Sequence, residues 1–223
     1  DANRRDFTIN GLFLDPITDT LHDWVGGQAD LVAKQLRTIG KPKERFGEDH
    51  LRLLRAVRFA AQLDFEIEPE TFDAARELAE KIRAVSAERI RDELLKLFCP
   101  PHAVRGLDLL RDSGLMAHIL PELLPTINCD QSPDFHPEGT VYNHIRLALE
   151  KLPTDAAATL PWAVLLHDIG KPNTASVGAD GRIHFYGHEK IGAETAEAIL
   201  ERLRFPGKQI DEIFRYHSQL SPK

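Results

Sequence analysis

Apolar residues recur at helical spacing through most of the chain after Gly47, and this pattern limits the folds that the chain can adopt. Leu51, Leu54, Val57 and Ala61 repeat every three to four residues in the first such segment. A stripe of this kind predicts an amphipathic helix with one buried face. Comparable patterns cover residues 72–82, 86–99, 102–112, 139–152, 156–168, 188–204 and 207–217. The chain is therefore predicted to be mainly α-helical.

The start of the chain has a different pattern. Residues 7–24 contain two β-favouring runs, FTINGLFLD and DTLHDW, separated by the turn sequence PIT, which predicts a short β-hairpin. A lone hairpin is marginally stable in water. We therefore expect these strands to be the edge of a larger sheet, and the chain, which starts at Asp1 without a methionine, to be a fragment that lacks an N-terminal portion.

Composition narrows the class of protein. The 223 residues are 42% hydrophobic and 28% charged, as in a soluble globular protein. No apolar run approaches the roughly eighteen residues of a membrane span, and the start does not resemble a signal peptide, so we expect a cytoplasmic protein without membrane contact. Cys99 and Cys129 form neither a metal-binding spacing nor a disulfide framework. The net charge of −7 argues against a surface that coats nucleic acid throughout.

The stretch GEDHLRLLRAVRFA, residues 47–60, carries a charged ridge. Asp49, Arg52, Arg55 and Arg58 occur at every third position, which on a helix gives an oblique row. Arginines favour planar, bidentate partners such as a phosphate or a base edge. A carboxylate next to an arginine offers both an acceptor and donors, as base recognition requires. The alternative is a solvated helix face on which Asp49 and Glu48 pair with Arg52, and periodicity alone favours neither.

Three stretches then resemble the consecutive motifs of one family. RRDFTINGL at residues 4–12, DWVGGQADL at 23–31 and GEDHLRLLRAVRFAAQLDF at 47–65 resemble motifs of the class II tRNA nucleotidyltransferase and poly(A) polymerase family, which includes the CCA-adding enzymes. They occur in the family's order and spacing. The resemblance implies a nucleotidyltransferase head of α/β type, of which the hairpin is a remnant, followed by a helical neck and body.

The resemblance also implies a set of nucleotide-binding residues. These are Arg5, Asp6, Asp49, Arg52, Arg55 and Arg58. The RRD residues would contact the phosphates and ribose, the EDxxR pair would present a base-reading edge to cytosine and adenine, and the last two arginines would hold the triphosphate. Simpler interpretations are ion pairs of Arg4 and Arg5 at a sheet edge, and a strand position for Asn10.

The family's catalytic carboxylates are expected outside this chain. The resemblance implies a DxD pair behind a GS-containing loop, which binds two Mg²⁺ ions and activates the primer hydroxyl. We find no such sequence between residues 1 and 223. We therefore expect the missing head to bind most of the Mg²⁺, this chain to contain no catalytic residue for nucleotidyl transfer, and this chain alone to bind nucleotide weakly without polymerising.

A second constellation lies in the last third of the chain. HPEGTVYNHI, LLHDIGKP, FYGHEKIG and RYHSQL supply His144, His167, Asp168, His188 and His217. The adjacent His–Asp pair ends an apolar helix before a Gly-Lys-Pro terminator, so a single metal could be ligated by both side chains. His144, from the preceding helix, could complete the site.

This arrangement resembles the HD superfamily of metal-dependent phosphohydrolases. The resemblance implies that His144, His167 and Asp168 ligate a divalent transition metal, that His188 and His217 bind a second metal or phosphate, and that Lys171 contacts phosphate. The implied reaction is hydrolysis of phosphomonoesters or 2′,3′-cyclic phosphates. Two departures stand against it: the last aspartate ligand would follow Lys223, and Thr140 replaces an aspartate. The alternative is a degenerate HD fold that only packs the end of the chain.

The expected organisation has four parts. Residues 1–40 form the C-terminal edge of the head, 41–120 a helical neck that binds nucleotide and RNA, 121–138 a linker, and 139–223 a truncated HD-like domain. The expected function of the parent enzyme is template-independent addition or repair of the tRNA 3′ CCA end from CTP and ATP. The partners would be the tRNA 3′ end and these nucleotides, and the oligomeric state is left open.

Three alternatives stay open beside this function. A poly(A) polymerase of the same family would share the EDHLR sequence but use ATP alone. A phosphohydrolase would use residues 139–223, with the upstream helices as a scaffold. A non-catalytic RNA-binding module would use Lys41, Lys43 and Arg45 to hold tRNA.

Overall fold

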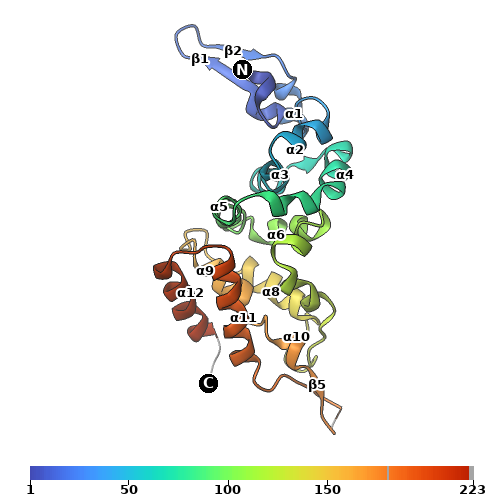
Figure 1. The fold of residues 1–223 in the computed structure, drawn as a ribbon, viewed down its shortest axis with the longest axis vertical. Coiled ribbons are helices and arrows are strands. Elements are labelled where there is room, and N and C mark those ends of the chain that lie inside the picture. Colours follow the sequence, from blue (N-terminus) through green and yellow to red (C-terminus); the bar gives the residue numbers. More distant parts are fainter. Residues whose placement is uncertain (180, 221–223) are drawn as a thin grey trace. The chain divides into compact units, whose positions relative to one another are not determined.

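The computed structural model describes residues 1–179 and 181–220, which divide into two compact units. The first unit comprises residues 1–86 and 108–118, and the second comprises 87–107 and the residues from 119 onward. Helices predominate in both, and each sheet in the described ranges has two strands (Figure 1). The mainly α fold with a short N-terminal hairpin is confirmed. None of the helices in these ranges combines the length and apolar character needed to cross a membrane.

The predicted hairpin is confirmed over part of its length. Strands β1 (Leu12–Asp15) and β2 (Thr20–Asp23) pair antiparallel. The preceding residues form a 3₁₀ helix, η2 (Thr8–Gly11), so the expectation of strand from residue 7 is wrong there. Asp6 Oδ1 accepts hydrogen bonds from the Phe7 N–H at 3.0 Å and from Asn10 Nδ2 at 2.9 Å. Such local side-chain bonds favour a turn over a strand.

The rest of the first unit is mostly helical. Its helices are η1 (Ala2–Arg4), α1 (Gly27–Ala33), α2 (Pro42–Glu48), α3 (Leu51–Leu63), α4 (Pro69–Glu77) and η3 (Ala79–Ala84). Two short strands, β3 (Gln35–Leu36) and β4 (Glu66–Ile67), pair in parallel. The apolar stripe predicted on α3 is confirmed, because Leu54, Val57 and Ala61 are fully buried. In contrast, Trp24 next to β2 is 65% exposed and stacks on His22, with 5.2 Å between the ring centroids.

Asp49 does not lie on a helix, and its predicted place in a helical row with the three arginines is wrong. The backbone of Asp49, between α2 and α3, is extended (φ −152°, ψ 107°). Its Oδ1 accepts a hydrogen bond from the Leu51 N–H at 3.0 Å. A short acidic side chain readily satisfies a free N–H at the start of a helix, so it interrupts the helical run there.

The second unit contains most of the remaining helices. Its elements are α5 (Ala87–Leu97), η4 (Pro121–Asn128), α8 (Val141–Glu150), α9 (Leu160–Leu166), α10 (Lys171–Thr174), β5 (Ser176–Val177), β6 (Ile183–His184), α11 (His188–Arg202) and α12 (Gly207–Leu220). Two helices, α6 (Ala103–Asp112) and α7 (Met116–Ile119), contribute residues to both units. Helix α9 starts later than the predicted residue 156, with Pro161 in its first turn.

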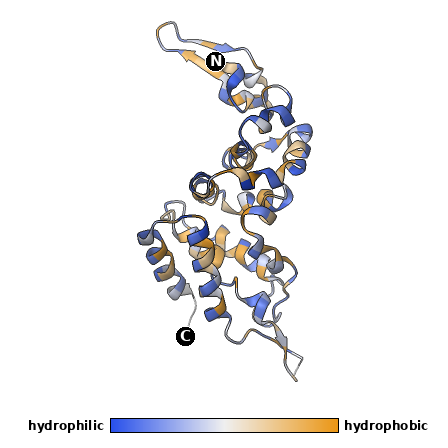
Figure 2. Cartoon of the chain, viewed as in Figure 1, coloured by the Kyte–Doolittle hydropathy of each residue, from blue (hydrophilic) through white to orange (hydrophobic). Residues whose placement is uncertain are grey.

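Helix α9 forms the centre of the second unit. It packs against α8 and α12, and its residues 161–166 are buried. Trp162 is fully buried between the rings of Phe98, at 5.6 Å, and Phe205, at 4.8 Å, both edge-on. Hydrophobic and hydrophilic residues lie on different sides of the surrounding helices (Figure 2). This core fixes the C-terminal end of α9, where His167 and Asp168 follow.

Gly170 should be sensitive to the smallest substitution. A Cβ there would lie 2.3 Å from the His188 carbonyl oxygen and 2.6 Å from the Gly192 nitrogen, both backbone atoms that cannot move independently. We expect Gly170→Ala to lower the free energy of unfolding by about 1–3 kcal/mol, as overpacking does. Gly207→Ala is the matched control, because nothing lies within 4 Å of the added Cβ. Equal denaturant unfolding curves for the two variants would contradict this packing.

Candidate functional site

The first unit contains a cavity of about 510 Å³ between the start of the chain and α3. We call it the arginine pocket. It is lined by Arg4, Arg5, Asp6, Asn10, Asp49, Arg52, Arg55 and Phe59. Five of the six predicted nucleotide-binding residues therefore line one cavity, although they come from segments more than 40 positions apart in the sequence.

Asp6 and Arg55 join the two sides of the arginine pocket. Arg55 Nε donates to Asp6 Oδ2 at 2.7 Å, and the Asp6 side chain is only 8% exposed. Burial raises the pKa of Asp6, but the hydrogen bond from Asn10 and the positive charge of Arg55 outweigh it, so this pKa lies below its ordinary value. Asp6 is therefore a carboxylate at neutral pH, and it holds the Arg55 guanidinium in place.

Arg52 is held by several acceptors. Its Nη1 donates to Glu48 Oε2 at 2.5 Å and to the Arg45 carbonyl at 2.9 Å, and its Nη2 donates to the Arg4 carbonyl at 3.2 Å. The hydrogen bond from Arg52 is the largest cause of the lowered pKa of Glu48. The Glu48–Arg52 pair of the solvated-face alternative is thus present, and Arg52 lines the arginine pocket as well.

Arg58 is the predicted residue that the structure does not bring to the pocket lining. Its side chain is buried, with the guanidinium 3.9 Å from the Phe59 ring centroid, and Nη1 donates to Gln62 at 2.8 Å. Each third residue on a helix is rotated by about 60°, so the end of the row faces another direction. Arg5 lines the pocket and lies 5.5 Å from the Phe13 ring centroid.

The second unit contains a cavity of about 760 Å³ with Asp168 in its wall. Three imidazoles direct Nε2 toward this carboxylate. His167 Nε2 lies 3.1 Å and His144 Nε2 3.8 Å from Asp168 Oδ2, and His188 Nε2 lies 3.9 Å from Oδ1. We call these residues, with His217, the histidine cluster. The structure thus brings together the predicted residues of four separate helical segments, α8, α9, α11 and α12.

The tautomers of two imidazoles follow from their partners. His167 Nδ1 lies 2.6 Å from the Val164 carbonyl oxygen, and His188 Nδ1 lies 2.8 Å from that of Phe185. A carbonyl only accepts, so each Nδ1 donates a proton, and a neutral ring keeps its lone pair on Nε2. For His167 this places two acceptor atoms 3.1 Å apart, which requires a proton or a cation between them.

Lys171 supplies one positive charge next to Asp168. Its Nζ lies 2.8 Å from Asp168 Oδ2 and donates to Gln131 Oε1 at 2.7 Å. Burial raises the pKa of Asp168, but the hydrogen bond with His167 and the charges of His167 and Lys171 hold it well below its ordinary value. Lys171 is itself buried, so the predicted phosphate contact is a side chain that is bound to Asp168 and Gln131 in this structure.

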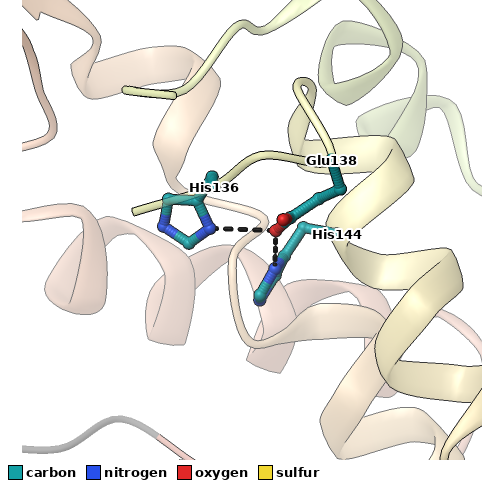
Figure 3. A group of neighbouring side chains, drawn as sticks. All are labelled: His136, Glu138 and His144. Carbon is teal, nitrogen blue, oxygen red and sulfur yellow. Dashed lines mark hydrogen bonds and ion pairs between the residues drawn. The ribbon is translucent and has the colours of Figure 1, made fainter. Parts of the chain in front are cut away.

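Two residues outside the predicted set adjoin the cluster. His136 Nδ1 lies 3.0 Å and His144 Nδ1 2.5 Å from the same oxygen, Glu138 Oε1 (Figure 3). Burial raises the pKa of Glu138, but its own backbone N–H and the two rings lower it to about 2. The only sequence signal was the HPEG stretch directly before the helix that carries His144.

The histidine cluster fits a divalent metal. Ligand atoms of His144, His167 and Asp168 all lie within 4.8 Å of one another. Burial lowers the pKa of His144 and of His217, so both rings are neutral and can ligate at neutral pH. Nε2 of His217, a residue only 8% exposed, has no hydrogen-bond partner within the described ranges. Imidazole with carboxylate suits metals such as Zn, Fe, Ni or Mn.

Three family models match successive parts of the chain. A poly A polymerase head domain matches residues 1–37, a probable RNA and SrmB-binding site of polymerase A matches residues 64–126, and an HD domain matches residues 136–223. The HD match covers the whole histidine cluster, and the head match covers the side of the arginine pocket that comes from the start of the chain.

Curated relatives match nearly the whole chain. An A-adding tRNA nucleotidyltransferase of Deinococcus radiodurans is 40% identical over 219 residues, which is 94% of this chain and 49% of that protein. A multifunctional CCA protein of Azoarcus sp. is 36% identical over 211 residues, which is 92% of this chain and 49% of that protein. The chain thus spans about half the length of the curated relatives that it matches.

Solved structures have a similar fold. The Bacillus stearothermophilus CCA-adding enzyme in complex with CTP aligns with a TM-score of 0.52 at 25% identity, over 99% of this chain and 59% of that one. The Thermotoga maritima CCA-adding enzyme complexed with tRNA aligns with a TM-score of 0.59 at 21% identity, over 98% of this chain and 48% of that one. The second similarity concerns the fold alone.

Asp6 should contribute to stability in a pH-dependent way. We expect Asp6→Ala to lower the free energy of unfolding by about 2 kcal/mol at pH 7, less than for a fully buried pair because Arg55 is partly exposed. The folded-state pKa lies below the ordinary value of 3.8, so the contribution is complete above that pH and is lost as the pH falls further. Unfolding curves between pH 7 and pH 2 check this. Asp1→Ala, which removes an exposed ion pair with Arg4, is the control. A difference in unfolding free energy between wild type and Asp6→Ala that does not change with pH would contradict the prediction.

Proposed function

The chain belongs to the tRNA nucleotidyltransferase and poly(A) polymerase family and carries an HD-type domain, and from this premise we propose that its parent enzyme adds or repairs the tRNA 3′ CCA end from CTP and ATP without a template. The arginine pocket would bind the incoming nucleotide. The observation that carries the proposal is the meeting of Arg5 and Asp6 with Asp49, Arg52 and Arg55 in one cavity. We retain the division into head edge, neck, linker and HD-like domain, and a cytoplasmic location, as part of the proposal.

Each side of the arginine pocket would have its own task. Asp49 offers carboxylate oxygens to an exocyclic amino group, which both cytosine and adenine carry and uracil lacks. Arg52 offers donors to the ring acceptors beside that group. Arg5 and Arg55 would bind phosphate oxygens, with Asp6 holding Arg55 through the 2.7 Å ion pair instead of contacting phosphate itself.

The residues of the arginine pocket do not fit a two-Mg²⁺ transfer centre. In the described ranges, the groups of three or more metal-ligating side chains whose ligand atoms lie within 4.8 Å of one another fall within residues 136–168, outside this pocket. Asp6 already accepts hydrogen bonds from Phe7, Asn10 and Arg55. We therefore assign to this pocket nucleotide binding and base choice and derive no transfer step through it.

The RNA-binding alternative has little free positive charge in α2 and at its start. Lys41 pairs with Glu44 at 3.0 Å, Lys43 with Glu77 at 2.6 Å, and Arg45 with Glu48 at 2.9 Å. Paired cations release fewer counterions from a nucleic acid. This weighs against a separate RNA-binding function that depends on these three cations.

Base discrimination should depend on Asp49. We expect Asp49→Ala in the full-length protein to reduce the preference for CTP and ATP over UTP and GTP by roughly 5- to 150-fold, the value of one bidentate base contact. Single-nucleotide incorporation on a tRNA lacking its CCA end measures this. Glu44→Ala, which removes an exposed carboxylate on α2, is the control. Unchanged discrimination in Asp49→Ala would refute the assigned base-reading role.

The same assay separates the alternatives within the family. Use of CTP and then ATP indicates CCA addition. Use of ATP alone on a tRNA that already ends in CC would match the name of the Deinococcus radiodurans relative. Repeated use of ATP on any RNA 3′ end would indicate a poly(A) polymerase.

A second activity is favoured by the histidine cluster. We assign to it metal-dependent hydrolysis of phosphomonoesters or 2′,3′-cyclic phosphates. His144, His167 and Asp168 would hold the metal, which supplies Lewis-acid activation of water and phosphate. Lys171 and Gln131 keep Asp168 ionised and oriented, and the 760 Å³ cavity accommodates a phosphate ester next to these groups.

Phosphatase activity should depend on the His–Asp pair. We expect His167→Ala and Asp168→Ala each to reduce hydrolysis of a phosphomonoester, measured with Ni²⁺ or Mn²⁺ in the full-length protein, by at least about 100-fold because a metal ligand is lost. His102→Ala is the control, since His102 lies outside the histidine cluster. Equal rates in all variants would indicate the degenerate alternative.

A further inference from the structure

The three imidazoles that face Asp168 are not anchored in the same way. His167 and His188 donate Nδ1–H to backbone carbonyls, at 2.6 and 2.8 Å. His144 instead directs Nδ1 to the Glu138 carboxylate at 2.5 Å. We propose that Glu138 is a positioning residue for His144, which fixes its Nδ1–H tautomer and thereby presents the Nε2 lone pair to the metal. The inference rests on the metal-binding role proposed for the histidine cluster.

The place of His144 in the fold explains why a side chain is needed. His144 lies in the interior of α8, where backbone carbonyls accept the hydrogen bonds of the helix itself. His167 directly follows α9, next to the carbonyls of the last turn, which lack helical partners, and His188 begins α11, next to the Phe185 carbonyl of the preceding loop. The ring of His144 therefore needs an acceptor from another segment, and the loop before α8 supplies the Glu138 carboxylate (Figure 3).

Glu138 is itself held in place. His136 Nδ1 lies 3.0 Å from the same carboxylate oxygen, and its ring packs edge to face against that of His144, with 4.9 Å between the ring centroids. Asn143 Nδ2 donates to the Glu138 carbonyl at 3.1 Å, and the Asn143 N–H donates to Thr140 Oγ1 at 3.3 Å. These contacts tie the loop to the first turn of α8. A carboxylate fixed in this way can orient an imidazole, as outer hydrogen-bond partners of metal ligands commonly do.

The same three side chains could be read as a second cation site, because ligand atoms of His136, Glu138 and His144 lie within 4.8 Å of one another. A neutral imidazole, however, has a single lone pair. If His144 Nδ1 bound a cation, Nε2 would carry the proton and could not ligate together with His167 and Asp168. The 2.5 Å separation between Nδ1 and Oε1 is that of a charge-assisted hydrogen bond, so we assign the proton to Nδ1.

The test compares Mn²⁺ binding and the His144 tautomer in the 223-residue chain. Mn²⁺ alone is titrated and the free ion is followed by electron paramagnetic resonance. We expect Glu138→Gln to weaken binding by about 10- to 100-fold without changing the number of ions bound. Glu138→Ala should weaken it at least as much. Glu150→Gln, an equivalent change at the exposed C-terminal end of α8, should leave the affinity unchanged.

The tautomer is read from ¹⁵N chemical shifts of the metal-free protein. We expect Nδ1–H for His144 in the wild type and a mixture of both tautomers in Glu138→Gln. Unchanged affinity and tautomer in that variant would overturn the proposal, and so would the loss of one bound ion, which would indicate a second cation site. If the wild type binds no Mn²⁺, the proposed metal site fails, and with it the presentation of His144 to a metal, while the tautomer still reports whether Glu138 orients the ring.

Discussion

The ion pair between Asp6 and Arg55 is the interaction on which the arginine pocket depends. It joins two segments that lie 49 positions apart in the sequence. Asp6 also accepts hydrogen bonds from Phe7 and Asn10, so one carboxylate both folds the start of the chain into a turn and attaches it to α3. A buried carboxylate with three donors remains charged, and it can therefore hold an arginine where a phosphate is to be bound.

The histidine cluster is also organised around a buried carboxylate, that of Asp168. A cation, Lys171, pairs with it, and three imidazoles direct Nε2 toward it. Backbone carbonyls fix the rings of His167 and His188, while Lys171 fixes Asp168. In both sites the side chain proposed to contact the ligand or metal is oriented by a second group. Asp6 orients Arg55, and backbone carbonyls orient His167 and His188.

The sequence was sufficient for those parts of the fold that follow from periodicity. Leu54, Val57 and Ala61 are buried because apolar residues at helical spacing form one face of the helix, and that face packs against the core. The sequence was insufficient where a hydrogen bond with a side chain determines the local backbone conformation. Asp49 satisfies the Leu51 N–H and so precedes α3, and Asp6 turns residues 8–11 into a 3₁₀ helix. Neither effect produces a period that could be read from the sequence.

The candidate sites show the same division. Five of the six residues predicted to bind nucleotide line the arginine pocket. Their prediction was possible because the motifs that carry them can be recognised in the sequence. Arg58 differs because stacking on Phe59 and a bond to Gln62 bury it, and spacing does not reveal such contacts. Glu138 was missed because its proximity to His144 arises from a loop that folds back onto α8, which only coordinates reveal.

The two tryptophans give each unit its own optical reporter. Trp162 is enclosed by Phe98 and Phe205 in the second unit, whereas Trp24, beside the hairpin of the first, is largely in contact with water. The sequence has no other tryptophan. Fluorescence from an enclosed indole lies at shorter wavelength than that from a hydrated one, so we expect the emission spectrum of these 223 residues to contain two separable components. Loss of the short-wavelength component would register disruption around α9, independently of events near the amino terminus.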